Sequence, residues 1–153
     1  MVMNMKNLVI SLLISLGIGG LSALVTSGSM DTYTTLIKPP LAPPSILFPI
    51  VWTILFILMG ISSYLIYESG DDNGSLKTYL IQLGINFVWP ILFFVVKNML
   101  LSLIWIILLD VIVIIMIKKF YKINKTAAYL QIPYLLWILF ATYLNYGFYI
   151  LNR

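Results

Sequence analysis

Long apolar runs separated by short polar stretches dominate this chain. Each run is close to the roughly 20 residues that an α-helix needs to cross about 30 Å of hydrocarbon. The runs are continuously apolar and lack the alternation of a membrane β-strand, which disfavours a β-barrel. We therefore predict a single all-α integral membrane domain over residues 1–153, a bundle of five transmembrane helices at approximately 7–26, 46–67, 79–96, 99–117 and 127–151.

The segment between the first two predicted helices, residues 27–45, is a loop whose second half is rich in proline. A proline fixes its own φ and pushes the preceding residue toward extended geometry. A rigid, mostly polyproline-like cap is therefore expected from Pro39, Pro40, Pro43 and Pro44. Pro49 is tolerated because it falls near a helix start. We expect this segment to be a lid over a pocket, with Trp52 in the wall beneath it.

Composition supports the membrane assignment and excludes several kinds of chemistry. Hydrophobic residues make up 61% of the chain and charged residues 9%, against about 25% charged residues in a soluble domain. The absence of cysteine and histidine excludes disulfides, thiolate catalysis, zinc–cysteine sites and histidine-ligated haem. The Asp71-Asp72 pair lacks the spacing of a calcium loop. We expect no metal site, and the net charge of +4 gives no reason to expect a nucleic-acid partner.

Basic residues are distributed unevenly between the two ends of the predicted bundle. The end with the N-terminus and the second and fourth loops has six: Lys6, Lys77, Lys118, Lys119, Lys122 and Lys125. The other end has Lys38, Lys97 and Arg153. The positive-inside rule then predicts a cytoplasmic N-terminus and a lid on the opposite side of the membrane.

Two polar residues, Asn86 and Asp110, fall near the middle of adjacent predicted helices. At about 1.5 Å per residue both lie roughly 16 Å below the lid. An ionisable residue at that depth is costly and usually faces the bundle interior with a partner. We expect Asp110 and Asn86 to interact, either as a structural hydrogen bond between helices or as a proton or cation relay.

Three tryptophans, Trp52, Trp89 and Trp137, are placed deeper than the aromatic belt at a membrane surface. They are either packing residues or large flat surfaces facing a cavity. Pro90 and Pro133 favour an internal space, because each frees a backbone carbonyl and tends to bend its helix.

A strip of small residues runs along the first predicted helix. Ser15, Gly19 and Ala23 recur at four-residue spacing, which lets another helix approach closely. We interpret this strip as a packing surface.

Several motifs occur together along almost the whole chain. These are K-P-P-L-A-P-P followed by V-W-T-I-L-F, then N-F-V-W-P-I-L-F-F, then Asp110, then P-Y-L-L-W-I-L-F-A-T-Y-L-N. Their order resembles the TspO/MBR family of tryptophan-rich sensory proteins and translocator proteins. The resemblance implies a five-helix bundle, usually dimeric, with a pocket open toward the first loop. It also implies binding of porphyrins, especially protoporphyrin IX, and some bacterial members are reported to degrade protoporphyrin in light.

The family motifs can be transferred to this chain residue by residue. They imply ligand contacts by Pro43, Pro44, Trp52, Asn86, Trp89, Phe93, Trp137, Ala141, Leu144 and Asn145, with Trp52 and Trp137 as the candidate catalytic residues and no required cofactor. Two departures reduce the stacking surface of the lid. Leu41 replaces the usual lid tryptophan, and Asp31, Thr32 and Tyr33 stand where relatives commonly carry another tryptophan.

The expected function is that of a membrane protein that binds a tetrapyrrole as a sensor, scavenger or carrier. Light-dependent porphyrin degradation is a candidate activity. The alternatives are a proton-coupled small-molecule transporter using Asp110 and a non-catalytic regulatory membrane partner. The expected partners are the lipid bilayer, a porphyrin or similar apolar aromatic molecule, and a second copy of the chain. The expected location is the plasma membrane of a bacterium.

Overall fold

The computed structural model describes residues 3–29, 31–70 and 73–153. Over these residues the chain consists of helices and short connections. The elements are α1 (Met5–Thr26), the 3-10 turn η1 (Ser27–Ser29), α2 (Asp31–Thr35), α3 (Leu47–Ser69), α4 (Ser75–Pro90), the π-helical segment η2 (Ile91–Val95), α5 (Met99–Ile123), α6 (Lys125–Leu130) and α7 (Ile132–Leu151). Asp71 and Asp72 lie outside the described residues.

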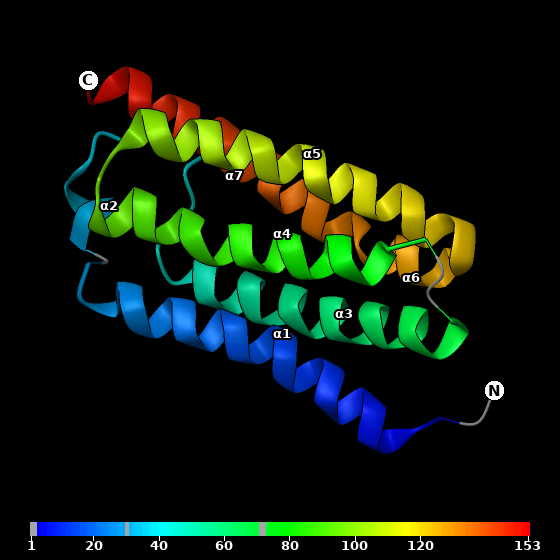
Figure 1. Ribbon diagram of the computed structural model, residues 1–153. Helices are drawn as coiled ribbons and strands as arrows, with labels where there is room; N and C mark the ends of the chain where they lie inside the picture. The colour runs from blue at the N-terminus through cyan, green and yellow to red at the C-terminus, as the bar shows by residue number, and fades with distance from the viewer. Residues whose placement is uncertain (1–2, 30, 71–72) are drawn as a thin grey trace.

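The described residues form five spans that are long and apolar enough to cross a membrane. These are Met5–Ser29, Leu47–Ser69, Ser75–Val95, Met99–Ile123 and Lys125–Leu151. The prediction of an all-α five-helix membrane bundle is therefore confirmed. In Figure 1 the lid, α2 and the C-terminus lie at one end of the bundle, and the N-terminus and α6 lie at the other. The predicted grouping of the loops at the two ends agrees with this arrangement.

The lysine-rich stretch 118–125 is not the loop that the sequence suggested. Helix α5 continues to Ile123, and Asn124 alone separates it from α6. The Asn124 side chain caps α6 by accepting a hydrogen bond from the Ala127 N–H. Lysines suit the end of α5, because cations at a helix C-terminus interact favourably with the helix dipole and their long stems can reach the membrane surface.

Prolines interrupt two of the spans, as predicted. Helix α4 ends at Pro90, and the next five residues form η2. The last span breaks at Gln131, with Pro133 in the first turn of α7. The wider π turn allows the neighbouring residues Phe93 and Phe94 both to be buried, with ring centroids 4.8 Å apart.

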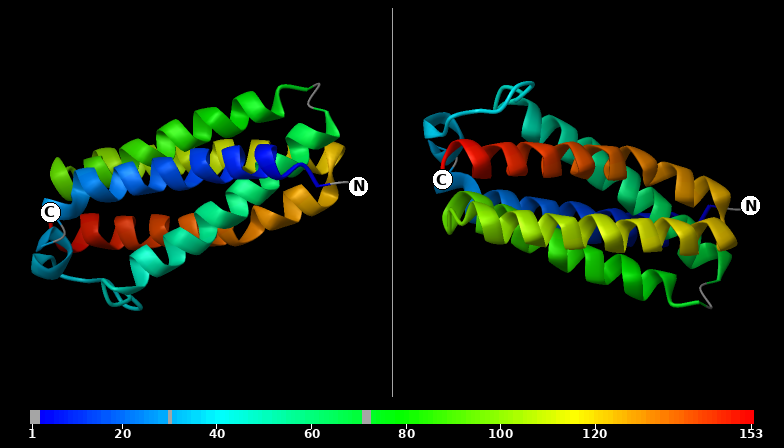
Figure 2. Two further views of the ribbon diagram at one scale, coloured as in Figure 1. Left: turned by 90° about the horizontal axis from the view of Figure 1, so that it is seen from below. Right: turned by 90° about the horizontal axis from the view of Figure 1, so that it is seen from above.

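The small-residue strip of α1 packs against α3, which confirms the packing interpretation. The Ser15 hydroxyl donates to the carbonyl of Phe56 at 2.7 Å. A Cβ atom added at Gly19 would lie 2.6 Å from the Phe56 ring, so only glycine permits this approach. Figure 2 shows α3 running obliquely across the bundle between its two ends.

Candidate functional site

The part of the lid that follows α2, from residue 36 onward, contains a tight turn rather than a continuous polyproline segment. The Ala42 N–H donates to the Pro39 carbonyl at 3.3 Å. Leu41 has a φ of 70°, and Pro40 precedes it, as in a type II turn. This turn corrects the polyproline expectation. Leu41 is 81% exposed and does not line the cavity below.

The lid is held by contacts with the second half of α7 and with Asn152, the residue that follows it. The Tyr143 hydroxyl donates to the Pro40 carbonyl at 2.7 Å. The Asn152 side chain accepts from the Ile37 N–H at 2.8 Å and donates to the Ile37 carbonyl at 2.9 Å. The ring of Pro39 sits against Gly147, where an added Cβ atom would come within 2.5 Å of it. The lid is thus tied to α7 by complementary polar and steric contacts.

Tyr33 from α2 forms the roof of the site under the lid. Its side chain is buried, and its hydroxyl donates to the carbonyl of Pro43. Burial raises the pKa of Tyr33, so the hydroxyl remains a donor. Its ring lies edge-on to Phe48 at 5.1 Å and to Phe148 at 5.6 Å between centroids. The segment in which relatives commonly carry a tryptophan therefore still supplies an aromatic surface through Tyr33.

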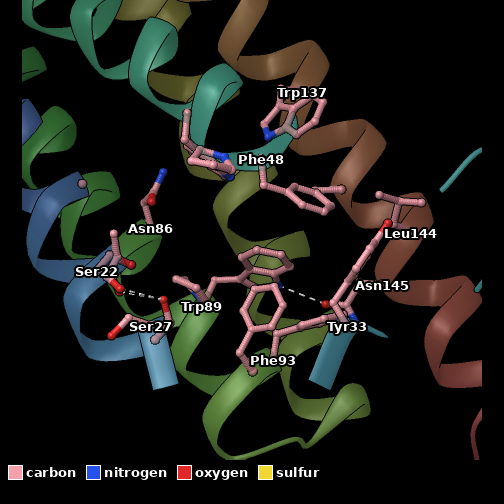
Figure 3. A pocket seen from close by; sticks show the side chains of 18 of the residues that line it. Ser22, Ser27, Tyr33, Phe48, Asn86, Trp89, Phe93, Trp137, Leu144 and Asn145 are labelled. Carbon is pink, nitrogen blue, oxygen red and sulfur yellow. Dashed lines mark hydrogen bonds between the residues drawn. The ribbon is translucent and has the colours of Figure 1, made fainter. Parts of the chain in front are cut away.

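A cavity of about 330 Å³ lies between α1, α3, α4, η2 and α7, with Tyr33 at one end of it (Figure 3). Most of its lining is apolar and aromatic. Eight of the ten predicted ligand contacts line it: Trp52, Asn86, Trp89, Phe93, Trp137, Ala141, Leu144 and Asn145. Pro43 and Pro44 do not line the cavity, and their contact with a ligand stays a prediction. Pro43 acts indirectly, because its carbonyl fixes the roof residue Tyr33.

Trp89 and Asn145 form a fixed pair at one wall of the cavity. The Trp89 indole N–H donates to Asn145 Oδ1 at 3.0 Å, as drawn in Figure 3. Asn145 Nδ2 in turn donates to the Met99 carbonyl at 3.0 Å. The Trp89 ring lies 5.3 Å from the Phe93 ring. This hydrogen-bond relay between α4, α7 and α5 sets the orientation of a large flat ring.

Trp52 and Trp137 supply aromatic surface from α3 and α7. The Trp52 ring lies 5.6 Å from Phe56, and the Trp137 ring lies 6.0 Å from Phe48. Trp137 Nε1 is buried and has no hydrogen-bond partner among the described residues. Trp105 differs, because its N–H donates to the Ile85 carbonyl at 2.8 Å and it does not line the cavity.

The expected pairing of Asn86 with Asp110 is wrong. Asn86 Nδ2 donates to the Tyr134 hydroxyl at 2.7 Å, and Asp110 Oδ2 accepts from the Thr142 hydroxyl at 2.7 Å. Both polar side chains turn toward α7 instead of toward each other. Asp110 does not line the cavity, and its contact with Thr142 is a hydrogen bond between helices.

The wall formed by α1 was missed by sequence reasoning. It consists of Gly19, Ser22, Ala23 and Thr26, with Ser27 of η1 beside them. Gly19 and Ala23 belong to the small-residue strip that was interpreted only as a packing surface. The Thr26 hydroxyl donates to the carbonyl of Ser22 at 2.9 Å, so its polar group is satisfied within α1. Small side chains here leave room for the cavity. The strip of small residues in the sequence could therefore have indicated the cavity.

The sequence model described as TspO/MBR family matches residues 9–151. The chain belongs to the TspO/MBR family. Within this family it is 44% identical to Tryptophan-rich protein TspO of Archaeoglobus fulgidus, over 98% of this chain and 99% of the relative. It is 37% identical to Tryptophan-rich protein TspO of Chlorobaculum tepidum, over 95% and 94%. It is 35% identical to Translocator protein of Bos taurus, over 89% and 83%.

Proposed function

We propose that this TspO/MBR protein binds a tetrapyrrole, with protoporphyrin IX as the best candidate, and acts as a sensor, scavenger or carrier. The observation that carries the proposal is an apolar cavity with tryptophans on three helices, α3, α4 and α7. A flat aromatic macrocycle can stack on indole rings in such a cavity. The chain contains no histidine, so the metal-free porphyrin suits the site better than an iron porphyrin.

The polar atoms around the cavity give the proposed ligand a defined orientation. Trp89 has its N–H committed to Asn145, so it offers only its ring face. Trp137 also offers its ring, because its unpaired N–H is buried and is not exposed to the cavity. Few polar groups at fixed positions are the usual means by which an apolar pocket orients its ligand.

Titration with protoporphyrin IX tests the binding proposal. We expect saturable quenching of tryptophan fluorescence at micromolar concentrations, because the macrocycle would stack on cavity tryptophans. Trp105→Phe is the matched control, since Trp105 lies outside the cavity. This variant should still show saturable quenching by protoporphyrin IX. Trp52→Phe should reduce both the quenching and the affinity. No quenching by the wild-type protein would contradict tetrapyrrole binding and favour a lipid-filled pocket.

We further propose that the protein degrades bound protoporphyrin in light, with dioxygen as the oxidant and Trp52 and Trp137 as the reacting indoles. Under illumination in air, the porphyrin absorbance should decay faster with the protein than without it. Trp52→Phe and Trp137→Phe should each slow this decay. Parallel samples in the dark and under argon supply the controls. Unchanged rates in both variants would remove these residues from the mechanism.

The proposal also includes a place for the protein in the cell: a homodimer in the plasma membrane, with a cytoplasmic N-terminus. The chain has no cysteine, so Leu41→Cys introduces a single thiol at a residue that is 81% exposed on the lid. A membrane-impermeant maleimide should label it from outside intact cells. A thiol that reacts only after the cytoplasmic side is opened would reverse the orientation.

A further inference from the structure

A second group of polar side chains is buried in the half of the bundle that lies toward the N-terminus. This polar cluster consists of Tyr79, Gln82, Asn86, Gln131 and Tyr134, none of which is more than 4% exposed. Three of them lie on one face of α4, at spacings of three and four residues, and two lie at the junction of α6 and α7. Figure 1 shows α6 and the beginning of α4 at the same end of the bundle.

A continuous set of hydrogen bonds joins the polar cluster to the cavity. Asn86, which lines the cavity, donates to the Tyr134 hydroxyl at 2.7 Å. The Tyr134 hydroxyl donates to Gln82 Oε1 at 2.6 Å. At about 1.5 Å per residue, Gln82 lies about 10 Å from the beginning of α4, and Gln131 lies about 10 Å from the beginning of α6. Both helices begin at the same end of the bundle (Figure 1), so the two glutamines lie at similar depth. The cluster therefore forms a layer below the cavity.

Three amide atoms of this layer have no hydrogen-bond partner among the described residues. They are Gln82 Nε2, Gln131 Nε2 and Gln131 Oε1. Leaving a buried polar group unpaired costs about 1–3 kcal/mol, and native structures retain few such groups. Tyr79 is different, because the hydroxyls of Ser15 and Ser63, which donate to the carbonyls of Phe56 and Gly60, can still accept from the Tyr79 hydroxyl.

We propose that the polar cluster binds ordered water molecules, which form a hydrated layer beneath the cavity. All five members are neutral amides or phenols, although the Asp110 carboxyl group interacts electrostatically with Tyr134. The unpaired atoms comprise two amide donors and one amide acceptor. Water matches this mixture because one small molecule can donate and accept and can make about three hydrogen bonds in a buried site.

The proposed water changes the polarity of the cavity at Asn86. Asn86 is hydrogen-bonded through Tyr134 to Gln82, whose Nε2 is one of the unpaired atoms. A polar group on any cavity ligand that reaches Asn86 would thus join a hydrated network instead of a dry apolar floor. The inference is independent of the identity of the ligand and of any photochemistry.

Radiolytic hydroxyl-radical labelling of the purified wild-type protein tests the hydrated layer. Water held beside a side chain generates radicals next to it, so Tyr79 and Tyr134 should be oxidised although both are buried. Tyr121, which is 45% exposed, reports the radical dose. Oxidation of Tyr121 with no oxidation of Tyr79 or Tyr134 would overturn the proposal.

Gln131→Leu tests the part played by Gln131 in holding the water. We expect loss of labelling at Tyr79 or Tyr134 and a lower melting temperature, because water partners are lost. In a dry core the same change would raise the melting temperature, since an unpaired amide would be removed.

Ile138→Leu, at a buried apolar residue, controls for repacking and should leave the labelling unchanged. Unaltered labelling in Gln131→Leu would exclude Gln131 from the site. The wild-type labelling decides the proposal even if the variant does not fold.

Discussion

Replacing Asn145 with leucine is expected to lower the free energy of unfolding by about 1–3 kcal/mol. The change removes the acceptor of the Trp89 indole N–H and the donor to the Met99 carbonyl. Because the Trp89 side chain is buried, its N–H would be left without water or a protein partner. Trp89 would also lose the contact that sets its ring orientation, so protoporphyrin binding should weaken. Thermal unfolding followed by circular dichroism in detergent micelles measures the first effect.

A double-mutant cycle isolates the hydrogen bond from other consequences of the substitution. Trp89→Phe removes the indole N–H, so adding Asn145→Leu to it should cost less than Asn145→Leu costs in the wild-type protein. Residues in direct contact commonly show coupling of about 0.5–3 kcal/mol. A cycle with strictly additive losses would mean that the Trp89–Asn145 pair does not stabilise the wall of the cavity.

Replacing Gly147 with alanine is expected to dislodge the lid from α7. The new Cβ atom would lie 2.5 Å from Pro39 Cβ and 2.8 Å from Pro39 Cγ, and a proline ring cannot rotate out of the way. Overpacking of this kind costs about 1–3 kcal/mol. The melting temperature should fall, and bound protoporphyrin should dissociate faster, because the roof residue Tyr33 is held by the lid carbonyl of Pro43.

Another glycine in the bundle provides a matched control for this steric effect. Gly84 in α4 has nothing within 4 Å of an added Cβ atom, so Gly84→Ala should stabilise the protein by about 0.5–1 kcal/mol through helix propensity. Pro39→Gly in the Gly147→Ala background removes the clashing ring and should restore slow ligand dissociation. If Gly147→Ala behaved like Gly84→Ala, close packing of the lid on α7 would be refuted.

The spans were predictable because a hydrophobic run of about 20 residues has few alternatives in a membrane. The cavity tryptophans were predictable for a related reason. Trp52, Trp89 and Trp137 lie at a depth where indole rings are uncommon as membrane anchors, and the helix-breaking Pro90 and Pro133 indicated internal space. The family motifs then gave the individual residues, eight of which line the cavity.

The features that sequence reasoning missed depend on side-chain direction and on contacts distant in sequence. Depth alone suggested that Asn86 and Asp110 meet, but it does not define the face on which each side chain lies; both point to α7. The turn at Leu41 requires a positive φ that a leucine gives no reason to expect. The residues that contact the lid come from the end of the chain. They lie so far from the lid in the sequence that no local pattern predicts these contacts.

The attachment of the lid also has a consequence for the order of assembly during synthesis. The hydrogen bonds between Asn152 and Ile37 join residues 115 positions apart, and the bond from Tyr143 to Pro40 spans 103. In contrast, the Ser15 to Phe56 contact between α1 and α3 spans 41 positions. Helices α1 and α3 can therefore pair while the remaining chain is still being translated. The lid can pack on α7 only after α7 has entered the membrane, so the cavity is complete only in the finished bundle.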